Sequence, residues 1–195
     1  METRALLGRN VTDSYGRNIG RVIGLEKNHF GELEAVQVEA LAGQIVSAKT
    51  RQLSVTPKSV SLTPEWKLDS NDLIQELSVL RKRVSALEEL RSSGEIGGEV
   101  YNELLSAQKT GYTEKLHSGR QLLESMSQRH ASITAQISSL TKYLANAKLD
   151  HKSGILDESS FKIAEQSLQP TLAPIIMEKT DLANSMKQLE TILAQ

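Results

Sequence analysis

The apolar residues of this chain follow two different periods, and the change falls near Pro64. Before that point, short apolar runs are separated by turn residues, and Leu33 to Glu39 nearly alternates apolar and polar side chains. A period of two is typical of a strand with one buried face. The stretch from Leu6 to Leu62 holds five or six such runs. It therefore predicts a small closed or nearly closed β-barrel, with Gly20 and Gly24 at bulges or corners.

Beyond Pro64, apolar side chains recur at alternating spacings of four and three residues. This heptad spacing is typical of coiled-coil helices. It predicts helices over about residues 68–92, 98–150 and 157–194. The apolar seam of these helices is the predicted self-association surface, and it consists of Leu73, Leu77, Leu80, Val84, Leu87, Leu116, Leu123, Met126, Ile133, Ile137, Leu140, Leu144, Leu182, Met186, Leu189 and Leu193. Lys109 and His130 are polar positions in the same seam, where polar side chains limit the register of pairing.

Two similar segments separate the predicted helices. Each begins with Ser-Gly, at Ser93 and at Ser153, and continues to an Ile or Leu and then to an aromatic residue. A glycine with positive φ commonly ends a helix, so both segments are predicted to be corners of helical hairpins. Pro170 and Pro174 lie near the start of the third heptad segment and predict a kink or a restart of the helix there.

Composition and charge narrow the function classes. The chain has no cysteine, which excludes disulfides, thiol catalysis and cysteine-ligated metal sites. Its formal net charge of −1 gives no strong overall attraction to nucleic acid or to an anionic membrane. The N-terminus has no apolar run suited to a signal peptide, and no apolar stretch approaches the roughly 20 residues that span a bilayer. We expect a soluble protein of a reducing cytoplasm.

The usual signatures of catalysis and of cofactor binding are missing from the sequence. It contains no nucleophile elbow, zinc-protease helix, phosphate-binding loop or dinucleotide fingerprint. The four histidines are not spaced to place two metal ligands on one helical face. We therefore expect no enzyme activity, cofactor or metal. The basic triplet Arg81, Lys82 and Arg83 is a weak candidate for contact with phosphate.

The residues Gly8 to Val22 contain a D-x-x-G turn followed by a strand with I-G-x-V, and this pattern resembles the PRC-barrel family. Joined to a coiled coil, it resembles the archaeal cell division protein A (CdvA) family. That resemblance rests on Asp13 to Val22, Gly94 to Tyr101 and Ser153 to Phe161. It implies an α+β fold, with a PRC-like β-barrel over residues 1–65 and a long α-helical coiled-coil or hairpin arm over 66–195.

The family resemblance also implies a function. It implies a filament-forming cytoskeletal scaffold that associates with itself and recruits ESCRT-III-like proteins to the division site at mid-cell. It further implies assembly associated with DNA or the nucleoid, and contact with the membrane that is indirect. In some relatives a short tail after the coil binds the partner, whereas here the heptads run to Leu193.

Two alternatives remain open at the level of sequence. The first is a dimeric DNA-associated adaptor, in which Arg9, Arg17, Arg21 and the triplet Arg81 to Arg83 contact phosphate, so that binding weakens steeply with salt. The second is a PRC-barrel adaptor similar to ribosome-maturation proteins, with the helices as a docking arm. Capture of partners would separate the second alternative from the scaffold.

Overall fold

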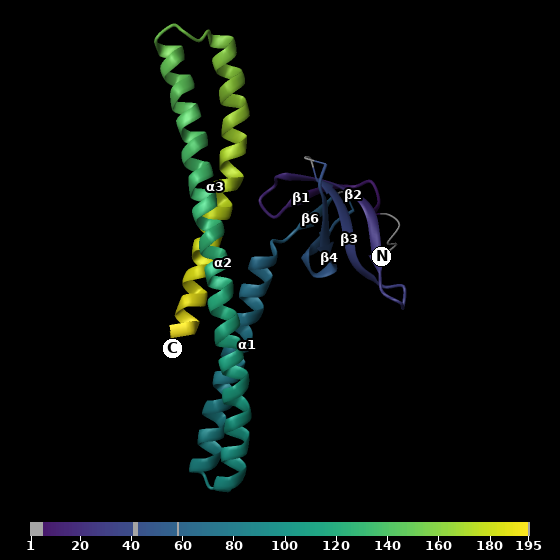
Figure 1. The fold of residues 1–195 in the computed structure, drawn as a ribbon, viewed down its shortest axis with the longest axis vertical. Helices are drawn as coiled ribbons and strands as arrows, with labels where there is room; N and C mark the ends of the chain where they lie inside the picture. The colour runs from purple at the N-terminus through teal and green to yellow at the C-terminus, as the bar shows by residue number, and fades with distance from the viewer. Residues whose placement is uncertain (1–5, 41–42, 58, 195) are drawn as a thin grey trace. The chain divides into compact units, whose positions relative to one another are not determined.

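The computed structural model describes residues 6–40, 43–57 and 59–194. Figure 1 shows a β-sheet followed by three long helices. The strands are β1 (Asn10–Asp13), β2 (Asn18–Lys27), β3 (Leu33–Ala40), β4 (Ile45–Lys49), β5 (Leu53–Val55) and β6 (Val60–Leu62). The helices are α1 (Glu65–Ser92), α2 (Gly98–Lys152) and α3 (Glu158–Ala194). This arrangement confirms the predicted α+β class with a helical arm.

A closed or nearly closed barrel was predicted, and the structure corrects this: the sheet is not closed. Its six strands lie in the order β4-β3-β2-β1-β6-β5, with β1 and β6 parallel and the other neighbours antiparallel. A short 3-10 turn, Thr50–Gln52, carries the chain from β4 to β5. Strand β5 then pairs with β6 and not with β4. As a result, β4 and β5 are the two opposite edges of the sheet.

The core of the sheet is built from small β-branched and aliphatic side chains, chiefly Leu6, Val11, Val22, Val36, Val38, Ala48 and Val60. Both predicted glycine positions depart from regular pairing. Gly24 follows an irregularity in the β2–β3 register. At Gly20 the strands approach so closely that a Cβ would lie 1.9 Å from the carbonyl oxygen of Glu39. Only glycine fits this close approach.

The three helices begin and end within three residues of the predicted positions. Pro170 and Pro174 lie inside α3, and the predicted restart does not occur because α3 is one continuous helix. Each proline removes only one backbone donor, so the turns on both sides stay helical.

Two compact units divide the chain: residues 1–68 with 135–178, and residues 69–134 with 179–195. All three helices therefore contribute to both units. We call these groups the sheet unit and the helical unit. The predicted domain boundary at residue 65 coincides with the first residue of α1. The division of the chain into a β domain over residues 1–65 and a helical region over 66–195 stays a prediction.

The corner between α1 and α2 belongs to the helical unit and closes with a Schellman motif. Gly94 has φ 77° and donates its N–H to the carbonyl of Arg91 at 3.1 Å. Glu95 donates to the carbonyl of Leu90 at 3.0 Å. These bonds satisfy carbonyls that the end of the helix leaves free. The guanidinium of Arg91 lies 4.5 Å from the centre of the Tyr101 ring, which fixes the start of α2 on the end of α1.

The corner between α2 and α3 belongs to the sheet unit and repeats this geometry. Gly154 has φ 75° and donates to the carbonyl of His151 at 3.1 Å. Ile155 donates to the carbonyl of Asp150 at 2.9 Å. Here the aromatic residue is Phe161, whose ring stacks on His151 with centres 4.7 Å apart. Both predicted hairpin corners are therefore confirmed.

Candidate self-association site

All sixteen predicted seam residues are buried or half-buried within the chain. The buried members are Leu73, Leu77, Leu87, Met126, Ile133, Leu182 and Leu189. The apolar seam is thus already used for packing between helices of a single chain. Pairing of the same seam between two chains stays a prediction. Any second chain must use the part of the helical surface that this packing leaves accessible.

The three helices meet at Gly119 in the helical unit. A Cβ at this position would lie 2.6 Å from Cδ2 of Leu193 on α3 and 3.1 Å from Cδ2 of Leu73 on α1. Residue 119 is also fully covered in the structure. The lack of a side chain therefore lets α1 and α3 pack closely on the same turn of α2.

Arg81 connects all three helices of the helical unit. Its Nη2 donates to the hydroxyl of Tyr112 on α2 at 3.1 Å and to the carbonyl of Ile192 on α3 at 2.5 Å. Arg81 on α1 thus bonds to both α2 and α3. The other two members of the basic triplet, Lys82 and Arg83, are exposed, and their contact with phosphate stays a prediction.

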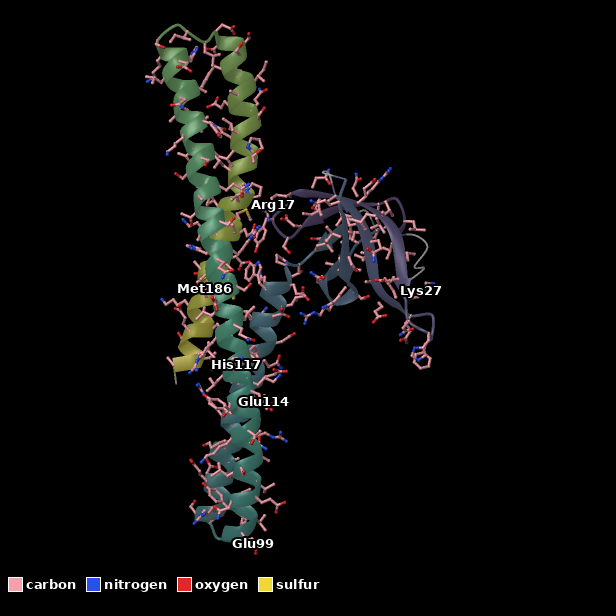
Figure 2. All side chains as sticks on the ribbon, viewed as in Figure 1. Arg17, Lys27, Glu99, Glu114, His117 and Met186 are labelled. Atoms are coloured by element: carbon pink, nitrogen blue, oxygen red, sulfur yellow. The ribbon has the colours of Figure 1, made fainter. Side chains whose placement is uncertain are left out.

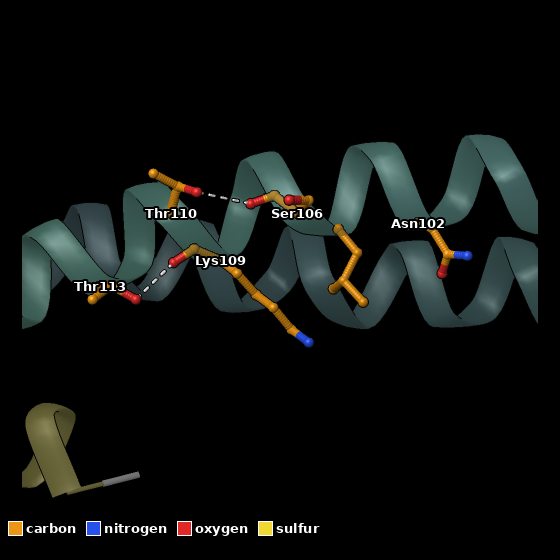
Figure 3. A pocket seen from close by; sticks show the side chains of 6 residues that line it. Asn102, Ser106, Lys109, Thr110 and Thr113 are labelled. Carbon is orange, nitrogen blue, oxygen red and sulfur yellow. Dashed lines mark hydrogen bonds between the residues drawn. The ribbon is translucent and has the colours of Figure 1, made fainter.

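A hollow extends along α1 and α2 from the position of Arg81. It is lined by Arg81, Val84, Ser85, Glu88, Leu105, Lys109 and Tyr112, and we call it the hairpin groove. Leu105 and Lys109 also border a second hollow on α2, shown in Figure 3, together with Asn102, Ser106, Thr110 and Thr113. Lys109, which the sequence placed in the apolar seam, is therefore an exposed cation beside an uncovered groove.

Arg17 forms the main charged contact of the sheet unit. Asp13 Oδ1 accepts the backbone N–H of Tyr15 at 2.9 Å and of Arg17 at 2.8 Å, which shapes the D-x-x-G turn. Arg17 Nε lies 2.5 Å from Asp13 Oδ2, and its Nη2 lies 2.5 Å from Oε2 of Glu178 on α3. Arg17, labelled in Figure 2, lies in the turn between β1 and β2. The motif therefore attaches the β1–β2 turn to a helix.

The charges of this contact support one another. Burial opposes the charge of the Arg17 guanidinium, but hydrogen bonds to Asp13 and Glu178 outweigh it and raise the pKa of Arg17. Glu178 is only 2% exposed. The guanidinium also lies 5.5 Å from the centre of the Tyr15 ring. Arg17 is thus engaged inside the chain, which weakens its case as a phosphate contact.

The sheet unit also exposes apolar side chains at one edge. Ile45 on the edge strand β4 is 65% exposed, and its neighbour Val46 is 42% exposed. An edge strand with exposed apolar side chains offers both unpaired backbone groups and apolar area to another chain. The sequence predicted a closed or nearly closed barrel and did not single out these two residues.

Two classes of site receive no support from the described residues. Within residues 6–40, 43–57 and 59–194, no group of three or more His, Asp or Glu side chains could hold a metal ion. Over the same residues, no helix is both long and apolar enough to cross a bilayer.

Comparison with known proteins identifies the helical region. A family model described as "CdvA-like coiled-coil domain" matches residues 65–195, which comprise about two thirds of the chain. The chain belongs to the CdvA family. Cell division protein A of Sulfolobus acidocaldarius is 23% identical over 184 residues, covering 94% of this chain and 77% of that protein. The CdvA family therefore assigns this chain a role in cell division.

The three segments that suggested the CdvA family have distinct structural roles. Asp13 to Val22 forms the Arg17 turn and the first half of β2, whereas Gly94 to Tyr101 and Ser153 to Phe161 form the two corners. The CdvA match begins at the first residue of α1. The PRC-barrel likeness of Gly8 to Val22 lies outside it and stays a prediction.

Proposed function

We propose that this chain is a non-enzymatic cytoskeletal scaffold of cell division that assembles into filaments. The observation that carries the proposal is the CdvA match over all three helices, together with a relative named Cell division protein A. The two tight corners and the hydrogen bond between Arg81 and Ile192 support a rigid helical structure that is suited to bearing load.

Assembly needs at least two contacts on each chain, because a single twofold contact yields only a dimer. The helical surface provides one contact, and the edge strand β4 with Ile45 and Val46 provides a second. A chain that pairs along β4 extends the sheet by main-chain hydrogen bonds. Alternation of the two contacts produces a polymer.

In this proposal the filament acts at mid-cell, in the cytoplasm, and recruits ESCRT-III-like division proteins. The exposed apolar side chains Tyr143, Leu149 and Ile163 on the α2–α3 hairpin offer these partners a docking surface. The recruited proteins would contact the membrane, so contact by this chain would be indirect.

Negative-stain electron microscopy of the purified protein, at several concentrations and with and without DNA, tests the proposal. We expect filaments from the protein alone. Ile45→Asp should prevent filament formation, because it places a charge at the β4 edge. Phe30→Asp is the matched control, since Phe30 is also exposed but lies in the β2–β3 turn. Monomers persisting at micromolar concentrations in light scattering would contradict the proposal.

A second candidate function is a dimeric DNA-associated or PRC-barrel adaptor. The exposure of Lys82 and Arg83 favours phosphate contact, and Arg21 lies on β2 while Arg9 directly precedes β1. Filaments that form only with DNA, or binding whose affinity falls steeply with salt, would support the DNA-associated function. Discrete dimers under every condition would favour the adaptor.

A further inference from the structure

We propose that protonation of His151 closes the corner between α2 and α3, and that loss of this proton loosens the corner as the pH rises. The device lies within one chain and needs no partner, so it goes beyond the proposed function and does not depend on it. It rests on two observations: the acceptors that face both ring nitrogens, and an equivalent position in the corner between α1 and α2.

Both ring nitrogens of His151 face hydrogen-bond acceptors. Nδ1 lies 3.1 Å from the carbonyl oxygen of Leu156 in the corner, and Nε2 lies 3.0 Å from Oε2 of Glu158 at the start of α3. A backbone carbonyl and an ionised carboxylate can only accept a hydrogen bond. A neutral imidazole has one N–H donor, whereas the imidazolium has two. Only the protonated ring can therefore donate to both partners at once.

A neutral ring would lose one of these two bonds. In either tautomer, the nitrogen without a hydrogen would face an oxygen that also lacks one. Glu158 does not supply the missing hydrogen, because Nζ of Lys162 lies 3.3 Å from its Oε1 and favours the ionised carboxylate. Loss of the ring proton therefore breaks a bond that joins the end of α2 either to the corner or to α3.

The corner between α1 and α2 has an equivalent position earlier in the chain. In each corner the glycine donates its N–H to the carbonyl three residues before it, at 3.1 Å, and this carbonyl belongs to Arg91 in one corner and to His151 in the other. The guanidinium of Arg91 lies 4.5 Å from the centre of the Tyr101 ring. The ring of His151 lies 4.7 Å from the centre of the Phe161 ring. Both corners thus place a side chain that can be a cation on an aromatic ring of the next helix.

The two corners differ in how the positive charge is supplied. Arginine is always charged in proteins, whereas histidine ordinarily changes its charge between about pH 5 and 8. The second corner also gives its cation a carboxylate, because Glu158 occupies the position that Gly98 has in the first corner. The same backbone geometry is therefore independent of pH in the first corner and dependent on pH in the second.

The charges around His151 do not oppose a positive ring. They lie on the contacts described above, beside the ring in sequence, or about one turn along either helix. They comprise four acids and three lysines, which are Asp150, Asp157, Glu158, Glu165, Lys148, Lys152 and Lys162. The acids outnumber the lysines by one, so the surroundings do not favour a neutral ring. The closed corner binds the proton more tightly than the open one, and its stability is therefore highest at low pH and falls as the pH rises.

Hydrogen exchange measured by mass spectrometry tests the proposal on the full chain. We expect the protection of backbone amides in residues 149–157, corrected for the chemical exchange rate, to fall between about pH 5.5 and about pH 8.5. The fall should be about three- to fivefold, as expected for one partly exposed charged contact. Residues 89–97 form the other corner and are the internal control, which should change by less than about twofold.

Two variants should remove the pH dependence by different means. His151→Arg places a permanent cation at position 151, as at position 91, and Glu158→Gln provides an amide that can donate to a neutral ring. Glu95→Gln is the matched control, because Glu95 accepts a hydrogen bond from Ser93 in the other corner. It should leave the fall in residues 149–157 unchanged. Circular dichroism checks that each variant folds.

The wild-type comparison of the two corners decides the question by itself if a variant fails to fold. Equal pH dependence of the two corners would overturn the proposal, and so would protection of residues 149–157 that rises with pH. A fall that persists in His151→Arg would also overturn it, because the pH dependence would then come from another group. None of these results depends on filaments, so each leaves the scaffold proposal to its own test.

Discussion

Replacement of Arg17 by methionine should be the most destabilising single change at the surface of the sheet unit. The change removes the guanidinium that contacts Asp13 and Glu178, while it keeps an apolar stem of similar length. Because Glu178 is only 2% exposed, its carboxylate would lose a cationic partner without gaining much contact with water. Breaking a buried ion pair from one side typically costs 3–5 kcal/mol. Since the Arg17 side chain is 28% exposed, we expect about 3 kcal/mol.

The reverse truncation should cost less. Glu178→Leu removes the buried charge itself and leaves Arg17 with Asp13 and partial access to water. We expect a loss of about 1 kcal/mol or less, because a buried pair replaced by apolar groups is often close to neutral. The double variant Arg17→Met with Glu178→Leu should then be more stable than Arg17→Met alone.

Urea unfolding followed by the fluorescence of Trp66, the single tryptophan, measures these differences in the unit that contains Arg17. Arg21→Met is the matched control, because the Arg21–Glu39 pair lies on the same sheet with side chains 63% and 42% exposed. We expect it to cost less than about 1 kcal/mol. Equal losses for Arg17→Met and Arg21→Met, or additive effects in the double variant, would refute the reasoning.

The remaining predictions concern Asp157 at the start of α3 and two glycines, Gly154 after α2 and Gly111 inside it. Hydrogen bonds from Ser159 and Ser160 lower the pKa of Asp157 from 3.8 to about 2. The charged carboxylate therefore stabilises the folded state above pH 3.8, and this contribution is lost as the pH falls towards 2. The free energy of unfolding of the wild type should exceed that of Asp157→Asn at pH 7, and the two values should converge near pH 2. Urea unfolding at a series of pH values measures both. Gly154→Ala should cost about 1 kcal/mol through its positive φ, whereas Gly111→Ala, in an open helical position, should stabilise by a similar amount. A destabilised Gly111→Ala in thermal unfolding would contradict this.

The helices could be predicted closely because the information that specifies them is local. Each turn of a helix is closed by hydrogen bonds four residues apart, and the heptad positions repeat on the same scale. The Ser-Gly segments end helices for the same reason, since the positive φ of Gly94 and Gly154 is set by those residues themselves. The D-x-x-G turn is also local, because Asp13 bonds to residues two and four positions later.

The sequence by itself thus determined the helices, their corners, the turn at Asp13 and the resemblance to a family. Tertiary structure decided that β5 pairs with β6 and leaves the sheet open, that Glu178 pairs with Arg17, and that Arg81 bonds to Ile192 across 111 positions in the chain. Such partners are chosen by the packing of whole elements. Because many charged residues in the sequence could serve as a partner for Arg17 or Arg81, only the folded chain selects one.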